Sequence, residues 1–409
     1  MRNYANRSGS LDGIRVLDLT RILAGPFCTQ ILGDMGAEII KVESKNGDDT
    51  RRWGPPFVEC NDDKPAESAY FLGINRNKKS VTIDFKTEKG RDLIKKLAVK
   101  SDILIENFLP NKLKSFGICY EELKIVNPKL IYCSITGYGP DGPYSGKPGY
   151  DAVISAAAGL MHITGEEGGT PVKVGVAITD VTTGLYAHGA VLAALYKRTL
   201  TGKGQKIDVS LLETQVATLV NVAHDYLLCG VEGTRMGTSH PSIVPYQCFR
   251  TKDSYIMVGV GNDKQFASFC EDIETAELAS NPKFRTNALR VANRKELVQL
   301  LNEVFAKKTT KDWENIFNTK NAFPFSKVNN IKETFENEQV LHRNMVVQVK
   351  HPRIKEKLKL VGIPVKFSDN ISSIRLPPPA LGQHSQEVLS EVLDISTDDI
   401  QKLILEGVI

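Results

Sequence analysis

The chain has 409 residues, more than one ordinary hydrophobic core accommodates, so its length predicts two domains. Its composition, 41% hydrophobic and 24% charged with a formal net charge of +4, is typical of a globular protein and argues against a nucleic-acid or membrane surface. No apolar run approaches the roughly 20 residues of a transmembrane helix. The seven scattered cysteines, which form no CxxC pair, argue against a disulfide framework or a zinc site.

The first 200 residues alternate between strand and helix patterns. Short apolar, partly β-branched runs predict strands over residues 14–19, 37–43, 80–85, 102–108 and 129–135. Segments 25–36 and 87–100 predict helices between them. Because strands that alternate with helices build a parallel sheet covered on both faces, the predicted fold class is α/β.

The carboxyl ends of the predicted strands are the expected ligand site, because open parallel sheets bind ligands there. The residues at those ends offer a cation, hydroxyls, amides and two aromatic rings: Thr20, Arg21, Glu43, Ser44, Asn107, Phe108, Thr136, Gly137 and Tyr138. This mixture favours a phosphorylated, aromatic ligand.

The remaining sequence predicts a second, smaller domain of mixed strands and helices. Helical patterns cover residues 182–198 and 211–228. From about residue 231 the pattern changes to mixed strands and helices. Residues 246–263 then predict a β-hairpin, and residues 293–308 and 396–407 predict helices.

Familiar catalytic and phosphate-binding motifs are missing from the sequence. There is no phosphate-binding GxxxxGK[ST] loop, no complete dinucleotide fingerprint, no HExxH and no GxSxG. The "GVGN" segment with Gly259, Gly261 and Asn262 is either a tight hairpin end or a mobile loop that covers a site.

Asp180 stands where the segment "VGVAITDVTTGLYA" turns helical. The pattern is typical of an N-cap, whose side chain accepts a hydrogen bond from the backbone two or three residues on. A carboxylate there is expected to stay ionised, because the helix N-terminus favours negative charge. Beside a ligand pocket it is also a competent nucleophile toward an activated acyl group. The local sequence by itself favours the cap.

Several segments in order resemble the family III coenzyme A transferases, the group that contains formyl-CoA transferase and carnitine CoA-transferase. They are "LDGIRVLDLTRILAGPFCTQILGDMGAEIIKVE", "KKSVTIDF", "DILIENF", "ITGYGPDGPY", "PGYDAVISAAAGL" and "VGVAITDVTTGLYA". The similarity continues through "MGTSHPSIVPYQCF" to "PPPALGQH" and so covers nearly the whole chain. Within the family, the last two segments and "NRKEL" are most similar to members that act on succinyl-CoA and a dicarboxylate such as glutarate.

The resemblance implies that Asp180 is a nucleophile. It would attack the donor thioester to form a mixed anhydride, and the released CoA thiolate would convert the anhydride into an aspartyl-CoA thioester. The acceptor acid would reverse these steps. Neither a metal nor a cofactor other than the substrate CoA is implied.

The resemblance also assigns binding residues. The implied CoA contacts are Arg21, Ala24, Ile83, Asn107, Phe108, Lys114 and Tyr138. Gly259, Gly261 and Asn262 correspond to a loop that covers the site and excludes water.

The implied fold is an interlocked, ring-shaped homodimer. A large Rossmann-like CoA-binding domain would comprise residues 1–205, with 350–409 returning to it. A linker helix over 206–234, a small α+β domain over 235–335 and a linker over 336–349 would complete the chain.

Two other functions compete with CoA transfer. In an α-methylacyl-CoA racemase, a related isomerase, a histidine works opposite the aspartate, but its position falls on Tyr150 in "PGYD". A phenol whose pKa is near 10 is a poor base at neutral pH, so transfer is favoured. A non-catalytic acyl-CoA-binding protein would not need Asp180.

The compartment is an expectation from two sources. The segment "MRNYANRSGS" is basic and free of acids, as transit peptides are, but it is short. The resemblance implies the mitochondrial matrix; the alternative is the cytoplasm. Neither nucleic acid nor membrane is expected as a partner.

Overall fold

The computed structural model describes residues 9–62, 65–370 and 372–409, so the N-terminal segment 1–8, on which the transit-peptide expectation rests, lies outside the described residues. The chain forms two compact units. Unit 1 comprises Met1–Leu160, Lys173–Cys229 and Gln339–Ile409, and unit 2 comprises Met161–Val172 and Gly230–Glu338. Within the described ranges, no helix combines the length and apolar character that crossing a bilayer requires.

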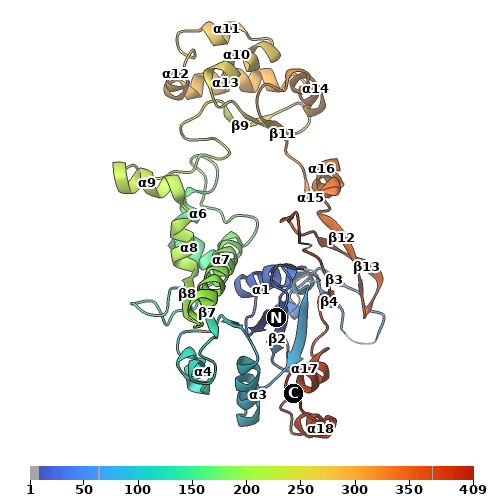
Figure 1. Cartoon of the computed structure of the whole chain (residues 1–409). Coiled ribbons are helices and arrows are strands. Elements are labelled where there is room, and N and C mark those ends of the chain that lie inside the picture. The colour runs from blue at the N-terminus through green and yellow to red at the C-terminus, as the bar shows by residue number, and fades with distance from the viewer. Residues whose placement is uncertain (1–8, 63–64, 371) are drawn as a thin grey trace. The chain divides into compact units, whose positions relative to one another are not determined.

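Unit 1 is built on a six-stranded parallel sheet (Figure 1). Its strands are β1 (Arg15–Asp18), β2 (Glu38–Glu43), β5 (Lys78–Thr82), β6 (Ile103–Glu106), β7 (Ile131–Thr136) and β8 (Lys206–Ser210). The spatial order is β5-β2-β1-β6-β7-β8, so the chain builds outward from β1 in one direction and then, from β6, in the other. The predicted α/β class with a parallel sheet is confirmed.

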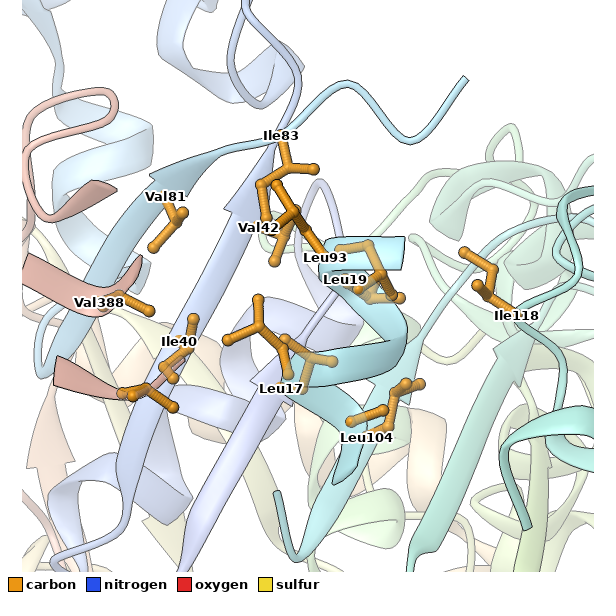
Figure 2. Close-up of a cluster of buried hydrophobic side chains, with 14 of the residues drawn as sticks. Leu17, Leu19, Ile40, Val42, Val81, Ile83, Leu93, Leu104, Ile118 and Val388 are labelled. Atoms are coloured by element: carbon orange, nitrogen blue, oxygen red, sulfur yellow. The ribbon is translucent and has the colours of Figure 1, made fainter. Parts of the chain in front are cut away.

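Helices cover both faces of this sheet because successive strand residues point to opposite sides. Leu17 belongs to a core cluster that includes side chains of α3, α4, α17 and α18, whereas Val16 belongs to a cluster that includes side chains of α1, α7 and α8. Figure 2 shows the first cluster, with Leu93 of α3 and Val388 of α17 beside the strands. The helices of unit 1 are α1 (Ala24–Asp34), α2 (Ala69–Ile74), α3 (Glu88–Val99), α4 (Tyr120–Val126), α5 (Asp151–Ala157), α7 (Ile178–Thr201), α8 (Leu211–Ala217), α9 (Val220–Cys229), α17 (Ser385–Glu391) and α18 (Thr397–Leu405).

The predicted linker helix over 206–234 is wrong in two respects. Its first residues form β8, an edge strand that pairs with β7 and whose Ile207 and Val209 pack on the core. The rest is two helices, α8 and α9, interrupted where Val220 has a φ of 45°. A residue with positive φ cannot continue a right-handed helix, which accounts for the break before α9.

The predicted linker over 336–349 also needs correction. Strand β12 (Val346–His351) begins inside it and pairs antiparallel with β13 (Ile354–Val361), so these residues form a hairpin of unit 1. The chain then returns to the sheet, where His384 N–H donates to the carbonyl of Ser80 at 2.9 Å. A second short hairpin joins β3 (Phe57–Val58) to β4 (Glu67–Ser68).

Unit 2 contains the antiparallel sheet β11-β10-β9 and several helices around an aromatic core. The predicted hairpin is confirmed as β9 (Tyr246–Arg250) and β10 (Tyr255–Gly259), and β11 (Phe325–Lys327) adds the third strand. Phe249, Phe269 and Phe305 are completely buried in this core. Its helices are α10 (Asp263–Asp272), α11 (Glu277–Ser280), α12 (Asn287–Ala292), α13 (Arg294–Phe305), α14 (Thr310–Lys320) and α15 (Ile331–Glu336), while α6 (Leu160–Ile163) and α16 (Glu338–His342) span the boundaries between the units.

Candidate active site

A cavity of ≈ 290 Å³ lies at the carboxyl ends of β1, β6 and β7. The sheet order reverses between β1 and β6, and this switch point is where open α/β sheets bind their ligands. The cavity is lined by residues 21–24 after β1, residues 107–110 after β6, residues 135–137 at the end of β7, residues 148–150, and Asp49, Asp180 and Leu211. Unit 1 therefore has a ligand-sized cavity where its topology predicts one.

Arg21 and Asn107 join two walls of the cavity. The side-chain amide of Asn107 accepts from Arg21 N–H at 2.9 Å and donates to the Arg21 carbonyl at 2.7 Å. The Arg21 guanidinium lies 5.4 Å from the centre of the Phe108 ring and 3.3 Å from Asp49, and about half of its side chain is exposed. An exposed ion pair of this kind is worth at most about 1 kcal/mol, so Arg21 can readily exchange Asp49 for an anionic ligand.

The loop before α1 is held in a strained conformation. Ile22, a lining residue, has a φ of 72°, which is costly for a β-branched side chain. Its N–H donates to Asp48 Oδ1 at 3.3 Å, and completely buried Lys41 donates to Asp48 Oδ2 at 2.9 Å and to the Thr20 carbonyl at 2.8 Å. Burial lowers the pKa of Lys41, but the charges of Asp48, Asp18 and Glu43 outweigh burial and raise it. The buried ion pair of Lys41 and Asp48 therefore holds the loop in this conformation.

Asp180 lines the cavity from the first turn of α7, but it is not the N-cap that the sequence pattern predicts. The helix begins at Ile178, so Asp180 is its third residue and Ala177 is the N-cap. The free N–H groups of Thr179 and Asp180 donate instead to Asp151 Oδ2, at 2.8 and 3.2 Å. Asp151, from α5, therefore supplies the capping carboxylate.

The expectation that Asp180 stays ionised because it caps a helix is also wrong. Burial, and then the negative charge of Asp151, raise the pKa of Asp180 to about 7. Among the described residues, no group donates a hydrogen bond to the Asp180 carboxyl, which would otherwise favour the charged form. The result is an acid whose ionised form is abundant at neutral pH and poorly stabilised by the protein.

Three further residues act at this site: Tyr150, which the sequence places opposite the aspartate in the racemase alternative, and Tyr70 and Asp151, which sequence reasoning missed. Tyr150 lines the cavity, and burial followed by the charges of Asp180, Asp151 and Asp48 raises the pKa of Tyr70 to about 12. Tyr70 is thus a protonated phenol near the two carboxylates and can donate a hydrogen bond. Asp151 had a signal, since an acid directly before the apolar run "AVISAA" is typical of a first helical turn.

The predicted CoA contacts divide into three groups. Arg21, Ala24, Asn107 and Phe108 line the cavity with Asp180. Lys114 lines a second cavity of ≈ 210 Å³, which adjoins the first because Leu109, Pro110 and Thr136 line both. Ile83 and Tyr138 line neither cavity.

Ile83 and Tyr138 pack elsewhere. Ile83 is completely buried in the core cluster of Figure 2, so its side chain is a core side chain. Tyr138 packs against the opposite core cluster and edge-to-face on Tyr144, with ring centres 5.8 Å apart. The apolar part of each side chain is thus packed against other side chains and does not face either cavity.

The predicted covering loop belongs to unit 2. Gly259 ends β10, and Gly261 N–H donates to the side chain of Gln265 at 2.8 Å. Asn262 caps α10 by accepting from Gln265 N–H at 2.9 Å. The loop is thus a capped connection between a strand and a helix, and its covering role stays a prediction.

No metal site emerges from the side chains. Within residues 9–62, 65–370 and 372–409, no group of three His, Cys, Asp or Glu side chains is arranged to hold a metal ion. The side chains that line the cavity include a carboxyl group, a guanidinium and a phenol.

Comparisons with known proteins show which family and which characterised enzymes this chain is similar to. Residues 11–385 match the profile of CoA-transferase family III. The chain is 49% identical over 405 residues to the succinyl-CoA:glutarate CoA-transferase of Homo sapiens, covering 99% of this chain and 91% of that protein. It is 40% identical over 395 residues to the succinate–glutarate CoA-transferase of Agrobacterium fabrum, covering 96% of this chain and 98% of that one. The crystal structure of a CAIB/BAIF family protein from Brucella suis is similar with a TM-score of 0.85 and 41% identity, covering 94% of this chain and 100% of that chain.

Proposed function

The chain belongs to CoA-transferase family III and is an enzyme of that family, and we propose that it transfers CoA from succinyl-CoA to a dicarboxylate such as glutarate. The relatives named for these substrates support the choice of donor and acceptor. Exchange of one thioester for another is nearly balanced in free energy, so the reaction requires no nucleotide and no metal.

Asp180 is the proposed nucleophile, and its place in the cavity at the switch point of the sheet carries the proposal. A carboxylate oxygen of Asp180 attacks the thioester carbonyl, the new C–O bond forms, and the C–S bond breaks with its electron pair leaving on the CoA thiolate. The thiolate then attacks the aspartyl carbonyl of the mixed anhydride and expels succinate. An aspartyl-CoA thioester remains.

The acceptor repeats these steps in reverse. Its carboxylate attacks the aspartyl-CoA carbonyl and releases the thiolate, giving a second mixed anhydride. The thiolate attacks the acceptor's acyl carbon, and Asp180 leaves as a carboxylate. No net proton is taken up, so the chain needs to position groups and exclude water rather than supply acid or base.

Other residues have supporting roles in this proposal. Arg21 contacts a CoA phosphate and the ring of Phe108 contacts the adenine, with Lys114 in the adjoining cavity as a second cation. Ala24 and Asn107 shape the wall. The loop of Gly259, Gly261 and Asn262 covers the reacting groups, since water would hydrolyse either intermediate.

The proposed enzyme is a homodimer, and the exposed apolar side chains of the chain support this. Tyr196 and Leu200 of α7 are 69% and 71% exposed, and Leu227 and Leu228 of α9 are 73% and 77% exposed. Large apolar side chains that are this exposed on helices favour an association surface. The interlocked ring and the mitochondrial matrix stay predictions.

The Asp180→Asn variant tests the nucleophile. We expect it to abolish exchange between succinyl-CoA and glutarate while CoA still binds, because the amide keeps the shape but cannot attack. Mass spectrometry of the wild type with succinyl-CoA should detect a CoA adduct on Asp180. The exposed Asp92→Asn on α3 is the matched control and should exchange normally.

Two results would contradict the proposal. Undiminished turnover in the Asp180→Asn variant would remove Asp180 from the chemistry. Deuterium exchange at the α-carbon of a branched acyl-CoA, without transfer to glutarate, would favour the racemase.

A further inference from the structure

Unit 2 contains a cavity of ≈ 420 Å³ whose wall is rich in cations. Its lining side chains come from segment 161–172, the stretch after Gly230 and the start of α13. Arg235, Arg294 and Lys295 contribute three positive charges, and Glu167 contributes one negative charge. The cavity therefore has an excess of positive charge before any ligand enters.

Only one terminal nitrogen of the Arg294 guanidinium, Nη2, is hydrogen-bonded to the main chain. Its Nη2 donates to the carbonyls of His240 and Pro241, at 2.9 and 2.7 Å. Its Nη1 is buried and has no hydrogen-bond partner within the described residues. Burial lowers the pKa of Arg294, with the charge of Glu167 acting in the opposite direction. A bound anion would supply the missing partner.

Arg235 repeats this arrangement. Its Nη1 donates to the carbonyl of His162 at 2.7 Å, while its Nε is buried without a partner in the described part of the chain. Gly165 has a φ of 131°, and a Cβ there would lie 3.1 Å from Cδ of Arg235. The close approach of this glycine holds the Arg235 stem in place.

Two guanidinium groups that each keep a buried N–H unpaired favour a planar, bidentate acceptor. A carboxylate matches that geometry, and buried donors are costly when they stay unsatisfied. Glu167 in the same wall disfavours a doubly charged phosphate more than a singly charged carboxylate.

We propose that the unit 2 cavity lined by Arg235 and Arg294 is a binding site for a small carboxylate, with a dicarboxylate such as glutarate as its expected ligand. The identity of the ligand rests on the proposed function.

Binding of glutarate to the full chain, measured by calorimetry, tests the unit 2 site. Arg294→Met and Arg235→Met keep much of the apolar stem and remove the charge, and we expect each to weaken binding about tenfold or more. The exposed Arg285→Met, also in unit 2, is the matched control and should bind normally. Glu167→Gln should tighten binding several-fold, a gain that a misfolded variant would not produce.

Three outcomes would overturn the unit 2 site: no binding of glutarate by the wild type at millimolar concentration, equal binding by wild type and Arg294→Met, or tighter Arg294-dependent binding of inorganic phosphate. Wild-type exchange activity is measured separately. If glutarate binds through Arg294 but no CoA is exchanged, the proposed function fails and the unit 2 site stands. If CoA is exchanged but glutarate binding does not depend on Arg294, the unit 2 site fails and the proposed function stands.

Discussion

Two carboxyl groups, Asp180 and Asp151, meet at the start of α7, and only Asp151 accepts the free N–H groups of the helix. Asp180 is left in a half-buried place with a like charge beside it, which raises its pKa to about 7. A carboxylate that the protein stabilises poorly is more basic and therefore a better nucleophile. The capping role therefore falls on Asp151, and the chemical role that we propose falls on Asp180.

The raised pKa of Asp180 predicts the pH dependence of the exchange. Because only the carboxylate can attack, kcat/KM should rise with pH through about 7 and level off above it. Asp151→Asn keeps an oxygen acceptor but removes the charge, so it should move the midpoint to lower pH. The measurement is the initial rate between about pH 5 and 9.

A flat profile across this range would contradict the raised pKa. So would an unchanged midpoint in the Asp151→Asn variant, because the charge of Asp151 is one of the two causes of the shift.

At the scale of elements, the contact between α1 and α7 positions Asp180, the proposed nucleophile. Gly184 lies one turn after Asp180 on the same face of α7, and a Cβ there would lie 2.7 Å from the carbonyl oxygen of Ala24. Ala24 is itself a lining residue, so this close approach brings Asp180 to the cavity wall.

Gly184→Ala should therefore impair both folding and catalysis. The added methyl meets backbone, which cannot give way as a side chain can, so the helices must separate at a cost of about 1–3 kcal/mol. We expect a lower melting temperature and a kcat/KM reduced about tenfold, because Asp180 moves with its helix. Gly73→Ala in α2 is the control, since a Cβ there meets nothing within 4 Å.

If Gly184→Ala is as stable and active as the wild type, the two helices are not packed as described. Loss of stability with unchanged kcat/KM would separate the packing from the position of Asp180.

Much of this architecture could be predicted from sequence, and the misses have physical reasons. The runs at 14–19 and 37–43 are buried on both sides, so their apolar composition is unambiguous. Strand β8 lies at the sheet edge, where exposed Lys206 and Asp208 alternate with half-buried apolar residues. Its apolar signal is therefore weak, and five residues are too few to stand out between two helical patterns.

The residues of the candidate site also divide into those that the sequence predicts and those that it does not. Arg21 and Asn107 follow strands directly, so the rule for strand ends predicts them. Tyr70 comes close to Asp180, and Arg294 lines its cavity, through tertiary packing that their own segments do not reveal. The pKa of Asp180 was predicted in the wrong direction because it depends on burial, and then on the charge of Asp151, 29 residues away.

At the scale of the molecule, the proposed homodimer predicts a mass in solution of about twice 45.2 kDa. Leu227→Glu combined with Leu228→Glu should weaken the dimer, because burying a carboxylate in an apolar interface is costly. Light scattering coupled to size-exclusion chromatography measures both.

Leu405→Glu on α18 is the control for this experiment, because Leu405 is 86% exposed but lies on a different helix. A monomeric wild type would contradict the homodimer. Equal effects of the α9 and α18 changes would show that the interface is not at α9.

The return of the chain to unit 1 has a consequence for how the protein is made. Val388, Leu389 and Ile400 pack in the same cluster as Leu17 and Ile40, although they leave the ribosome more than 300 residues later. The β1–β2 region therefore has to wait, with part of its apolar surface uncovered, while all of unit 2 is synthesised. Both segments of unit 2 are synthesised before the C-terminal segment of unit 1. Unit 2 can therefore complete its own core before unit 1 does.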